Sequence, residues 1–429
     1  MLGAGVNGVT TGYFLAQRGH EVVVVDRQSE PANETSYANG GVIGGTQVEP
    51  WAKAGLPWKI LAWLGQENAP LLVRFNQLPR IWRWGHLFIA NCTDGRFRRN
   101  LAANVALTRY SLDEFARFRA DAGIDGSEYD LCRRGALKVF NTMEAFTAAQ
   151  HTTAYINDLG IPVRVLGPQD AARIEPALVP TLGSIVGALH YPDEEIGDCR
   201  KFTQLVAHLG ARLGIEFRYG TTAHRLVLRN GRVAAVETSA GPISGDRFVV
   251  ALASYSAPFL RSAGLSVPVV PVKGVTVTVS AEGWDSPLRA AVVDHSRLFG
   301  LIRIGDRIRA SGSAEITGYD RTPSASRCQA LLDNVVALFP AFANCLRAGA
   351  PIRWAGVRGN TPDGRPILGP TPLGNLFLNI GHGPQGWSTS CGASRLVADM
   401  VSGLPPAIDP EPLTLGRFRR GGRGKTSPQ

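Results

Sequence analysis

A glycine-rich turn at the start of the chain constrains its fold more than any other feature. The opening MLGAGVNGVTTGYFLAQRGHEVVVVD holds Gly3, Gly5 and Gly8 in the spacing Gly-x-Gly-x-x-Gly, and residues with helical spacing follow. Such glycines permit a tight turn and let a pyrophosphate approach the N-terminus of the helix, where the helix dipole favours negative charge. The apolar run 22–25 in EVVVVD then predicts a buried strand, and Asp26 follows where an acid can bind a ribose. The pattern predicts a dinucleotide-binding α/β domain.

Only Met1 and Leu2 precede this turn, although a turn of this kind usually leaves a longer buried strand. Two or three absent Val or Ile side chains would each forgo about 1.5–3 kcal/mol of burial. Together these losses would be a large part of the net stability of a folded domain, which is about 5–15 kcal/mol. We therefore expect the natural start to lie several residues upstream, with an apolar β-branched run before Leu2. The alternative is that the chain as it stands folds but holds its cofactor weakly.

The composition predicts a soluble protein of two domains. The chain has 429 residues, 44% of them hydrophobic, and shows neither a long apolar run nor a basic leader before an apolar stretch. Its six cysteines are far apart and form no Cys-x-x-Cys pair, which favours reduced thiols in the cytoplasm over a disulfide framework or a zinc site. The eight histidines are equally dispersed, so we expect no metal site.

The net charge of +10 leaves nucleic acid, anionic lipid or simple solubility open. Part of this charge lies in the glycine-rich, basic tail 416–429, which we predict to be disordered. Charges of both signs interleave elsewhere, and no aromatic-rich RNA-binding motif accompanies them. We therefore expect a solvated surface and no nucleic-acid partner.

A second glycine-rich turn, GHGPQG at 381–386, lies between a predicted strand at 376–380 and a predicted helix at 387–401. A turn that opens a helix directs backbone N–H groups at a ligand atom, and in flavin enzymes that atom is the pyrimidine oxygen. For this turn alone, a helix cap with close packing is an equal alternative. The polar, glycine-rich loop 27–45 suits an extended cofactor, so the two turns together favour a flavin dinucleotide.

The motifs of the chain resemble those of the FAD-dependent D-amino-acid oxidase/glycine oxidase family, and within it the small subunit of D-amino-acid dehydrogenase. Besides the first turn, the matching segments are VVDR at 24–27, ETSYANGG at 34–41, WAKAGLPWKILAWL at 51–64, PDEEIGDCRKFTQ at 192–204, SYS at 254–256, PVKG at 271–274, RIRASGSAEITGY at 307–319, GVRGNTPDGRPILG at 356–369 and GHGPQGW at 381–387. They occur in the family's order and span the chain from residue 1 to about 415.

The resemblance implies an enzyme that removes the α-hydrogen of a D-amino acid as hydride to flavin N5. The imino acid is hydrolysed to a 2-oxo acid and ammonia, and the electrons pass to a respiratory-chain acceptor such as a quinone. Because no attachment Cys or His of the family type is evident, we expect noncovalent FAD. The residues implied to bind it are Gly3, Ala4, Gly5, Val6, Asn7, Gly8, Asp26, Arg27, Ser36, Asn39, Gly40, Ala223, Gly381, Gly383, Gln385, Gly386 and Trp387.

Arg358 is the residue that the resemblance assigns to the substrate carboxylate. The planar guanidinium suits a carboxylate bidentately, in a way that Lys could not reproduce. The alternative is an ordinary ion pair with an acid such as Asp363. The chain departs from the family's pattern at Gly359, where the motif has proline, and at Ala253, where many relatives have glycine.

The resemblance also implies how the chain divides. We expect an α/β protein in which a Rossmann-like FAD-binding domain interleaves with an α+β substrate domain built on an antiparallel or mixed sheet. The predicted FAD-binding segments are 1–50, 197–258 and 352–415, and the substrate domain comprises 51–196 and 259–351. Asn230-Gly231 predicts the turn of a β-hairpin within the FAD-binding part.

The segment 51–84 contains five of the eight tryptophans, with basic residues between them. It predicts either a helical cover over the substrate pocket or an amphipathic segment on a membrane surface, because Trp and basic residues suit the headgroup layer. The two interpretations are compatible. We accordingly expect a cytoplasmic protein, with peripheral contact at the inner face of the cytoplasmic membrane left open.

Other functions remain open at this point. A related flavin enzyme could act on a cyclic imino acid of the D-proline type, or on glycine with oxygen as the acceptor, because pocket-wall residues follow no motif. A catalytically weak flavin-binding protein is the third class. Reduction of the flavin by a panel of amino acids would separate these classes.

Overall fold

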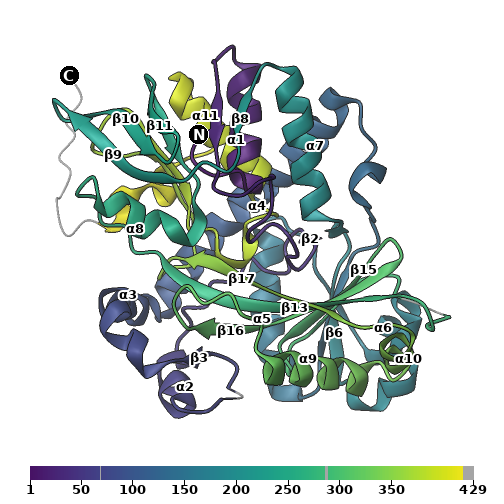
Figure 1. Cartoon of the computed structure of the whole chain (residues 1–429). Coiled ribbons are helices and arrows are strands. Elements are labelled where there is room, and N and C mark those ends of the chain that lie inside the picture. Colours follow the sequence, from purple (N-terminus) through teal and green to yellow (C-terminus); the bar gives the residue numbers. More distant parts are fainter. Residues whose placement is uncertain (68, 286–287, 419–429) are drawn as a thin grey trace.

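The computed structural model describes residues 1–67, 69–285 and 288–418 (Figure 1). The first glycine turn runs directly into helix α1 (Val6–Gln17), which therefore begins before Gly8 rather than after it. Within the described residues, no helix combines the length and the apolar character needed to cross a bilayer. Of the predicted tail, 416–418 lie in a short 3-10 turn, where Arg417 pairs with Asp363, and the rest lies outside the described residues.

A parallel sheet carries the first glycine turn. Leu2 forms parallel bridges both to Val25 and to Val250, so the residue before the turn sits between two strands and is 3% exposed. The backbone N–H of Gly3 also donates to the carbonyl of Val25. This arrangement aims the turn out of the carboxyl end of the sheet, as a dinucleotide-binding fold requires. The strands are β1 (Val23–Val25), β8 (Glu216–Arg218), β12 (Phe248–Val250), β19 (Leu376–Ile380) and β18 (Ile367–Pro370), the last antiparallel to β19.

Long helices cover the same sheet and bury its apolar side chains. Helix α1 contributes Val9 and Phe14 to a buried cluster that also contains Phe115 of a neighbouring helix, and all three are at most 1% exposed. The helices around α1 are α4 (Asp94–Ala122), α7 (Cys199–Arg212) and α11 (Ser390–Ser402). Helix α11 begins three residues later than predicted, because 386–389 form a turn between the 3-10 turn at 383–385 and the helix.

A small antiparallel sheet lies beside this layer. Its strands are β9 (Ala223–Arg229), β10 (Arg232–Thr238) and β11 (Gly241–Ser244). Asn230 and Gly231 both have positive φ, 50° and 72°, as a two-residue hairpin turn of type I′ requires. The predicted hairpin is therefore confirmed.

A nine-stranded mixed sheet forms the second part of the molecule (Figure 1). Its longest strands are β13 (Val270–Ser280), β16 (Arg307–Ile316) and β17 (Ile352–Asn360), and β17 lies at one edge of the sheet. The other strands are β3 (Leu72–Val73), β4 (Ala136–Phe140), β5 (Arg164–Leu166), β6 (Gly187–Tyr191), β14 (Ala291–Asp294) and β15 (Phe299–Ile304), and β2 (Val42–Ile43) pairs separately with β7 (Glu195–Ile196).

The two faces of this large sheet differ. Val275, Val277 and Ala310 lie on the apolar face, which packs against α9 (Ala325–Leu338) and α10 (Phe342–Ala348). The alternate residues of β13 and β17 form the opposite face, because directly paired residues point the same way.

The remaining helices are α2 (Leu56–Trp63), α3 (Leu78–Asn91), α5 (Met143–Asp158), α6 (Pro168–Ile174) and α8 (Ser256–Arg261).

Candidate active site

The first glycine turn is closed so tightly that side chains are excluded at two of its positions. A Cβ at Gly3 would lie 2.5 Å from the carbonyl oxygen of Ala251, and the residue has φ of 105°. A Cβ at Gly8 would lie 2.0 Å from the carbonyl oxygen of Gly3. Gly5 is the N-cap residue of α1 and has no side chain to cap the N–H groups of the first helical turn, of which that of Val6 donates to Ser36. The turn has the geometry of an anion-binding helix N-terminus.

The acid predicted to bind a ribose lies directly against this turn. The carboxylate of Asp26 accepts a hydrogen bond of 2.6 Å from the backbone N–H of Ala4 and one of 2.8 Å from Gln28. Burial raises its pKa above the ordinary value, and the two N–H donors oppose that rise. The carbonyl of Asp26 accepts from Thr221, two residues before Ala223, so the structure brings these predicted residues to one end of the turn.

Arg27 is held by its neighbours rather than left free. Its guanidinium donates to Glu34 at 2.6 Å and lies over the ring of Tyr255, 4.0 Å from the centroid. Ser36 accepts a 3.1 Å hydrogen bond from the backbone N–H of Val6, at the first residue of α1. The loop after the second strand is thus tied back onto the glycine turn.

The same loop continues onto the large sheet, across the face opposite α9. The carbonyl of Asn39 accepts from Arg309 at 3.3 Å, and a Cβ at Gly40 would touch the hydroxyl of Ser311 at 3.5 Å. Both Arg309 and Ser311 lie on β16. The predicted cofactor residues therefore span from the glycine turn to the sheet that carries Arg358.

The second glycine turn lies beside the first. The side-chain amide of Asn7 in α1 donates to the carbonyl of Gly386 at 3.1 Å, which joins the two turns directly. Gly381 and Gly383 have φ of 78° and 56°. The two predicted turns are therefore in direct contact, although more than 370 residues separate them in the chain.

The side chains of the second turn have different surroundings. The indole of Trp387 is buried against Phe202, with ring centroids 6.2 Å apart, in the core around α1. His382 is bonded to Asn379 and Thr389, and burial lowers its pKa to about 3, so the imidazole is neutral. Gln385 is 5% exposed, and its amide oxygen has no hydrogen-bond partner among the described residues.

Arg358 extends from β17 on the face of the sheet opposite α9. One amino group donates to the carbonyl of Ser313 at 3.3 Å, and within the described part of the chain its Nε has no partner. Burial lowers the pKa of this guanidinium to about 10. By accessible area the residue as a whole is half-buried, although its Nε is buried. A cation so placed favours an anionic ligand.

The alternative ion pair with Asp363 does not form. Asp363 is bound instead by Arg365 at 2.9 Å and by Arg417 at 2.7 Å. No carboxylate lies within ion-pair distance of Arg358 among the residues that the structure describes. The charge of Arg358 is therefore not neutralised inside the protein, which the sequence alone left undecided.

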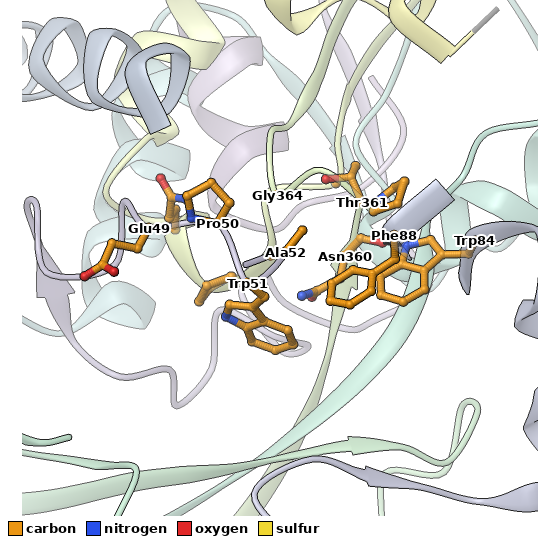
Figure 2. A pocket seen from close by; sticks show the side chains of 14 residues that line it. Glu49, Pro50, Trp51, Ala52, Trp84, Phe88, Asn360, Thr361 and Gly364 are labelled. Carbon is orange, nitrogen blue, oxygen red and sulfur yellow. Dashed lines mark hydrogen bonds between the residues drawn. The ribbon is translucent and has the colours of Figure 1, made fainter. Parts of the chain in front are cut away.

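A pocket adjoins the second turn and the end of β17 (Figure 2). Trp84 and Phe88 of α3 stack 5.0 Å apart, and the indole N–H of Trp84 donates to the carbonyl of Asn360 at 3.0 Å. Sequence reasoning did not single out Asn360, although it follows Arg358 by two residues in the same strand. The lining residues are Glu49, Pro50, Trp51, Ala52, Trp84, Phe88, Asn360, Thr361, Pro362, Gly364, Gly381, Gly383, Pro384 and Gln385.

Sequence reasoning also missed a buried acid behind the cofactor loop. Glu194 is 2% exposed and accepts hydrogen bonds from the backbone N–H of Gly45 at 2.9 Å and from the hydroxyl of Thr46 at 2.6 Å. Burial raises its pKa to about 7. The N–H of Gly44 donates in turn to Ser388, just after the second turn. In the sequence, the only feature that singles out Glu194 is its position in the matching segment 192–204.

The described residues contain no group of three or more His, Cys, Asp or Glu side chains placed to hold a metal ion. All six cysteines are free, and four of them are buried. The candidate site therefore rests on the two glycine turns, on polar side chains such as those of Asp26 and Gln385, and on the guanidinium of Arg358.

Known proteins are similar to this chain in sequence over nearly its whole length. The chain is 40% identical over 418 residues to a D-amino acid dehydrogenase of Agrobacterium fabrum, covering 97% of this chain and 99% of that relative. It is 41% identical over 419 residues to one of Azorhizobium caulinodans, covering 98% and 99%. These relatives confirm the resemblance stated above.

Solved structures of other proteins have a fold similar to that of this chain. L-proline dehydrogenase from P. horikoshii has a TM-score of 0.75 at 19% identity, covering 97% of this chain and 96% of that one. Glycine oxidase from Geobacillus kaustophilus has a TM-score of 0.74 at 22% identity, covering 97% and 98%. The predicted α/β fold class is thus confirmed. A sequence profile described as FAD dependent oxidoreductase matches residues 2–400, and the chain belongs to that family.

Proposed function

We propose that this chain is an FAD-dependent D-amino acid dehydrogenase. It oxidises a D-amino acid at Cα to an imino acid, which water hydrolyses to a 2-oxo acid and ammonia. The relatives of about 40% identity carry this name, and the family uses FAD. The observation that carries the proposal is Arg358, a deep guanidinium with no carboxylate partner among the described residues.

The chain fits the cofactor that its family implies. The first glycine turn closes tightly on the protein's own backbone at Gly3 and Gly8, and the Asn7–Gly386 hydrogen bond joins it to the second turn. Asp26 lies at the ribose end, and Gln385 brings an amide without a protein partner to the other end. We assign noncovalent FAD to the whole set of turn and loop residues named above.

Arg358 holds the substrate by its carboxylate in this proposal. The guanidinium can donate two parallel hydrogen bonds, which fix the orientation of the amino acid as well as its position. When bound, FAD supplies the acceptor for the hydride that leaves Cα. The protein's contribution is therefore mainly positioning, since a hydride transfer of this kind needs Cα–H close to the ring.

The electron acceptor that we propose is a membrane quinone. The segment 51–84 presents large apolar side chains to solvent: Trp58 is 76%, Leu61 57% and Trp82 66% exposed. Lys59 and Arg83 lie among them. Tryptophan and basic side chains on one surface suit the headgroup layer of an anionic membrane. We accordingly propose a cytoplasmic protein that docks on the inner face of the cytoplasmic membrane.

Anaerobic reduction of the bound flavin tests the proposed reaction without an acceptor. D-amino acids should bleach the flavin absorbance and yield one 2-oxo acid and one ammonia per flavin, whereas the L-enantiomers should not. Glycine, D-proline and L-proline belong in the same panel, because they separate the related chemistries. Bleaching by glycine, proline or L-amino acids alone would contradict the proposal.

A further inference from the structure

A cluster of buried charges lies on the face of the large sheet opposite Arg358. Lys273 of β13 is two residues from Val275 and so faces α9, and its Nζ lies 3.3 Å from the carboxylate of Glu315, its partner in β16. Arg327 of α9, the helix that covers this face (Figure 1), lies 3.2 Å from the same carboxylate. The three side chains are at most 10% exposed. Because buried ion pairs contribute little net stability, stability alone does not account for this cluster.

The ladder of β13 and β16 is irregular between these charges and Arg358. Between two regular pairings, the single residue Gly274 lies opposite both Ser313 and Ala314. This is a β-bulge, and its first residue, Ser313, has φ of 67°. The left-handed region suits glycine but is costly for serine, so the conformation of Ser313 needs support from its surroundings. A bulge also takes a peptide out of the regular ladder, which lets its carbonyl bond elsewhere.

The carbonyl of Ser313 is the group that the bulge presents to Arg358. It accepts a hydrogen bond of 3.3 Å from Nη2 of Arg358, and within the described part of the chain this is the single hydrogen bond of the guanidinium. The direction of the guanidinium therefore depends on one carbonyl, and the direction of that carbonyl depends on the φ of Ser313. A change in this φ would leave the charge of Arg358 in place but turn away the acceptor that orients it.

The buried charges supply the support that Ser313 needs. Its hydroxyl donates to the carboxylate of Glu315 at 2.7 Å and accepts from Nε of Arg327 at 2.9 Å. The serine side chain is thus bound by both an acceptor and a donor. These hydrogen bonds favour a conformation that the backbone of a serine would otherwise avoid.

The two groups that hold Ser313 are themselves fixed. The second oxygen of the Glu315 carboxylate faces the ammonium group of Lys273. The terminal nitrogens of Arg327 donate to the backbone carbonyls of Glu67 and Ala69, so each nitrogen of this guanidinium has a partner. Both contacts of Ser313 therefore come from side chains that are held in place, as a positioning role requires.

We propose that Ser313, Glu315 and Arg327 are positioning residues that set the direction of the Arg358 guanidinium for the substrate carboxylate. The inference rests on the proposed function, in which Arg358 binds that carboxylate. Glu315 and Arg327 act from the opposite face of the sheet, by holding the bulge. Their effect on the substrate therefore passes through the conformation of Ser313.

Three substitutions of Ser313 test this role. Glycine adopts the left-handed conformation freely and needs no support, alanine keeps the cost and loses the support, and β-branched valine tolerates the conformation least. The concentration of D-amino acid that half-saturates anaerobic flavin reduction should rise about twofold or less in Ser313→Gly, about fivefold in Ser313→Ala and about twentyfold in Ser313→Val. The limiting rate of reduction should change less. If the hydroxyl acted only as a hydrogen-bonding group, the glycine and alanine variants would be equal.

Binding without turnover gives an independent readout. The ligands 3-methylbutanoate and 3-methylbutanamide have the same shape, but only the first carries the charge that Arg358 would bind. In titrations followed by flavin absorbance, the wild-type protein should prefer the carboxylate by about tenfold or more, and Ser313→Val should reduce this preference to about twofold. Asn230→Val is the control: Asn230 also has a positive φ, 50°, but lies in an exposed hairpin turn, so Tm should fall while the preference stays unchanged.

A double-mutant cycle tests the part of Arg327. Arg327→Lys keeps the positive charge but loses the planar group that contacts Ser313 and two carbonyls. It should raise the half-saturating concentration about fivefold in the wild-type background and leave it nearly unchanged in the Ser313→Gly background, because glycine needs no support. An equal effect in both backgrounds would show that Arg327 acts by another route, and would overturn its assignment.

The outcomes separate this inference from the proposed function. Reduction by D-amino acids with equal kinetics in Ser313→Gly and Ser313→Ala would overturn the inference and leave the proposed function intact, and this pair decides the matter even if Ser313→Val does not fold. Absence of reduction by every D-amino acid would overturn the proposed function, while the carboxylate preference of the same variants would still decide the positioning role. A wild-type protein that binds both ligands equally would overturn the role of Arg358 and, with it, the inference.

Discussion

Gly274 leaves the space that the guanidinium of Arg358 occupies. A Cβ built at position 274 in β13 would lie 2.6 Å from Nη2 of Arg358 in the neighbouring strand β17. The two residues are thus fitted to each other across the ladder, with the carbonyl of Ser313 in β16 as the third contact. A glycine in one strand therefore sets where the proposed carboxylate clamp can lie.

Gly274→Ala should displace this guanidinium and weaken amino acid binding. The added methyl group cannot be accommodated without moving Arg358, so we expect the KM for a D-amino acid to rise about tenfold while bound flavin stays unchanged. Gly349→Ala is the control, because a Cβ there would meet nothing within 4 Å and its φ of −165° suits alanine. Equal KM values for both variants and the wild-type protein would show that Gly274 is not required to place Arg358.

Glu194 should make stability depend on pH in one direction. Its folded pKa is raised to about 7 from the ordinary 4.5, so the folded state binds more protons than the unfolded state between these values. The free energy of unfolding should therefore fall as pH rises from about 4.5 to 7, by up to about 3 kcal/mol. Urea unfolding at a series of pH values measures this.

Glu194→Gln removes the titrating group and should abolish that part of the pH dependence. Glu21→Gln, at an exposed position, should leave the dependence as it is in the wild-type protein. Parallel curves for Glu194→Gln and the wild-type protein would contradict the account of this buried acid.

The flavin should be removable without breaking a covalent bond. Acid precipitation of the yellow protein should leave the flavin in the supernatant, because the proposed contacts are hydrogen bonds and packing. Absorbance of the two fractions measures the outcome. Colour that stays with the pellet would establish a covalent link.

The exposed tryptophans should carry the proposed membrane contact. The double variant Trp58→Ala/Trp82→Ala should bind vesicles of anionic lipid at least several-fold more weakly than the wild-type protein in a sedimentation assay. Met143→Ala removes a side chain of similar exposure, 58%, from α5 and should bind as the wild-type protein does. Failure of the wild-type protein to bind these vesicles would refute membrane docking through α2 and α3.

Local patterns predicted the two glycine turns because their signals lie within short stretches. Gly3, Gly5 and Gly8 are followed by a helix, a strand and Asp26 in a fixed order, and the structure brings this acid to 2.6 Å from the turn. The turn at 381–386 was predicted in the same way. What the sequence could not supply was the contact between the turns, which Asn7 makes to a residue 379 positions away.

The surroundings of Arg358 could not be predicted for a related reason. The alternation of side chains along a strand shows which residues share a face. The neighbours of Arg358, Gly274 and Ser313, depend instead on the pairing of β13 with β16 and β17. The pocket depends on Trp84 from a helix more than 270 positions from Asn360. Such contacts arise from packing between distant segments and leave no local period.

The two departures from the family's motifs meet in the structure. A Cβ at Gly359 would lie 3.0 Å from the carbonyl carbon of Ala253, and Ala253 has φ of 47°, a conformation that favours glycine. The chain thus has glycine at 359, where the family's motif has proline, and alanine at 253, where many relatives have glycine. Sequence reasoning noted each position separately and could not show that they are in contact.

Arg358→Lys tests the central claim most directly, with Arg353→Lys at an exposed position of the same strand as its control. Lysine keeps the charge but loses the bidentate geometry, so the concentration of D-amino acid that half-saturates anaerobic flavin reduction should rise roughly a hundredfold. Bound flavin per chain should stay at the wild-type level, and Arg353→Lys should behave as the wild-type protein. Unchanged reduction kinetics in Arg358→Lys would contradict the account and make Arg358 a structural residue.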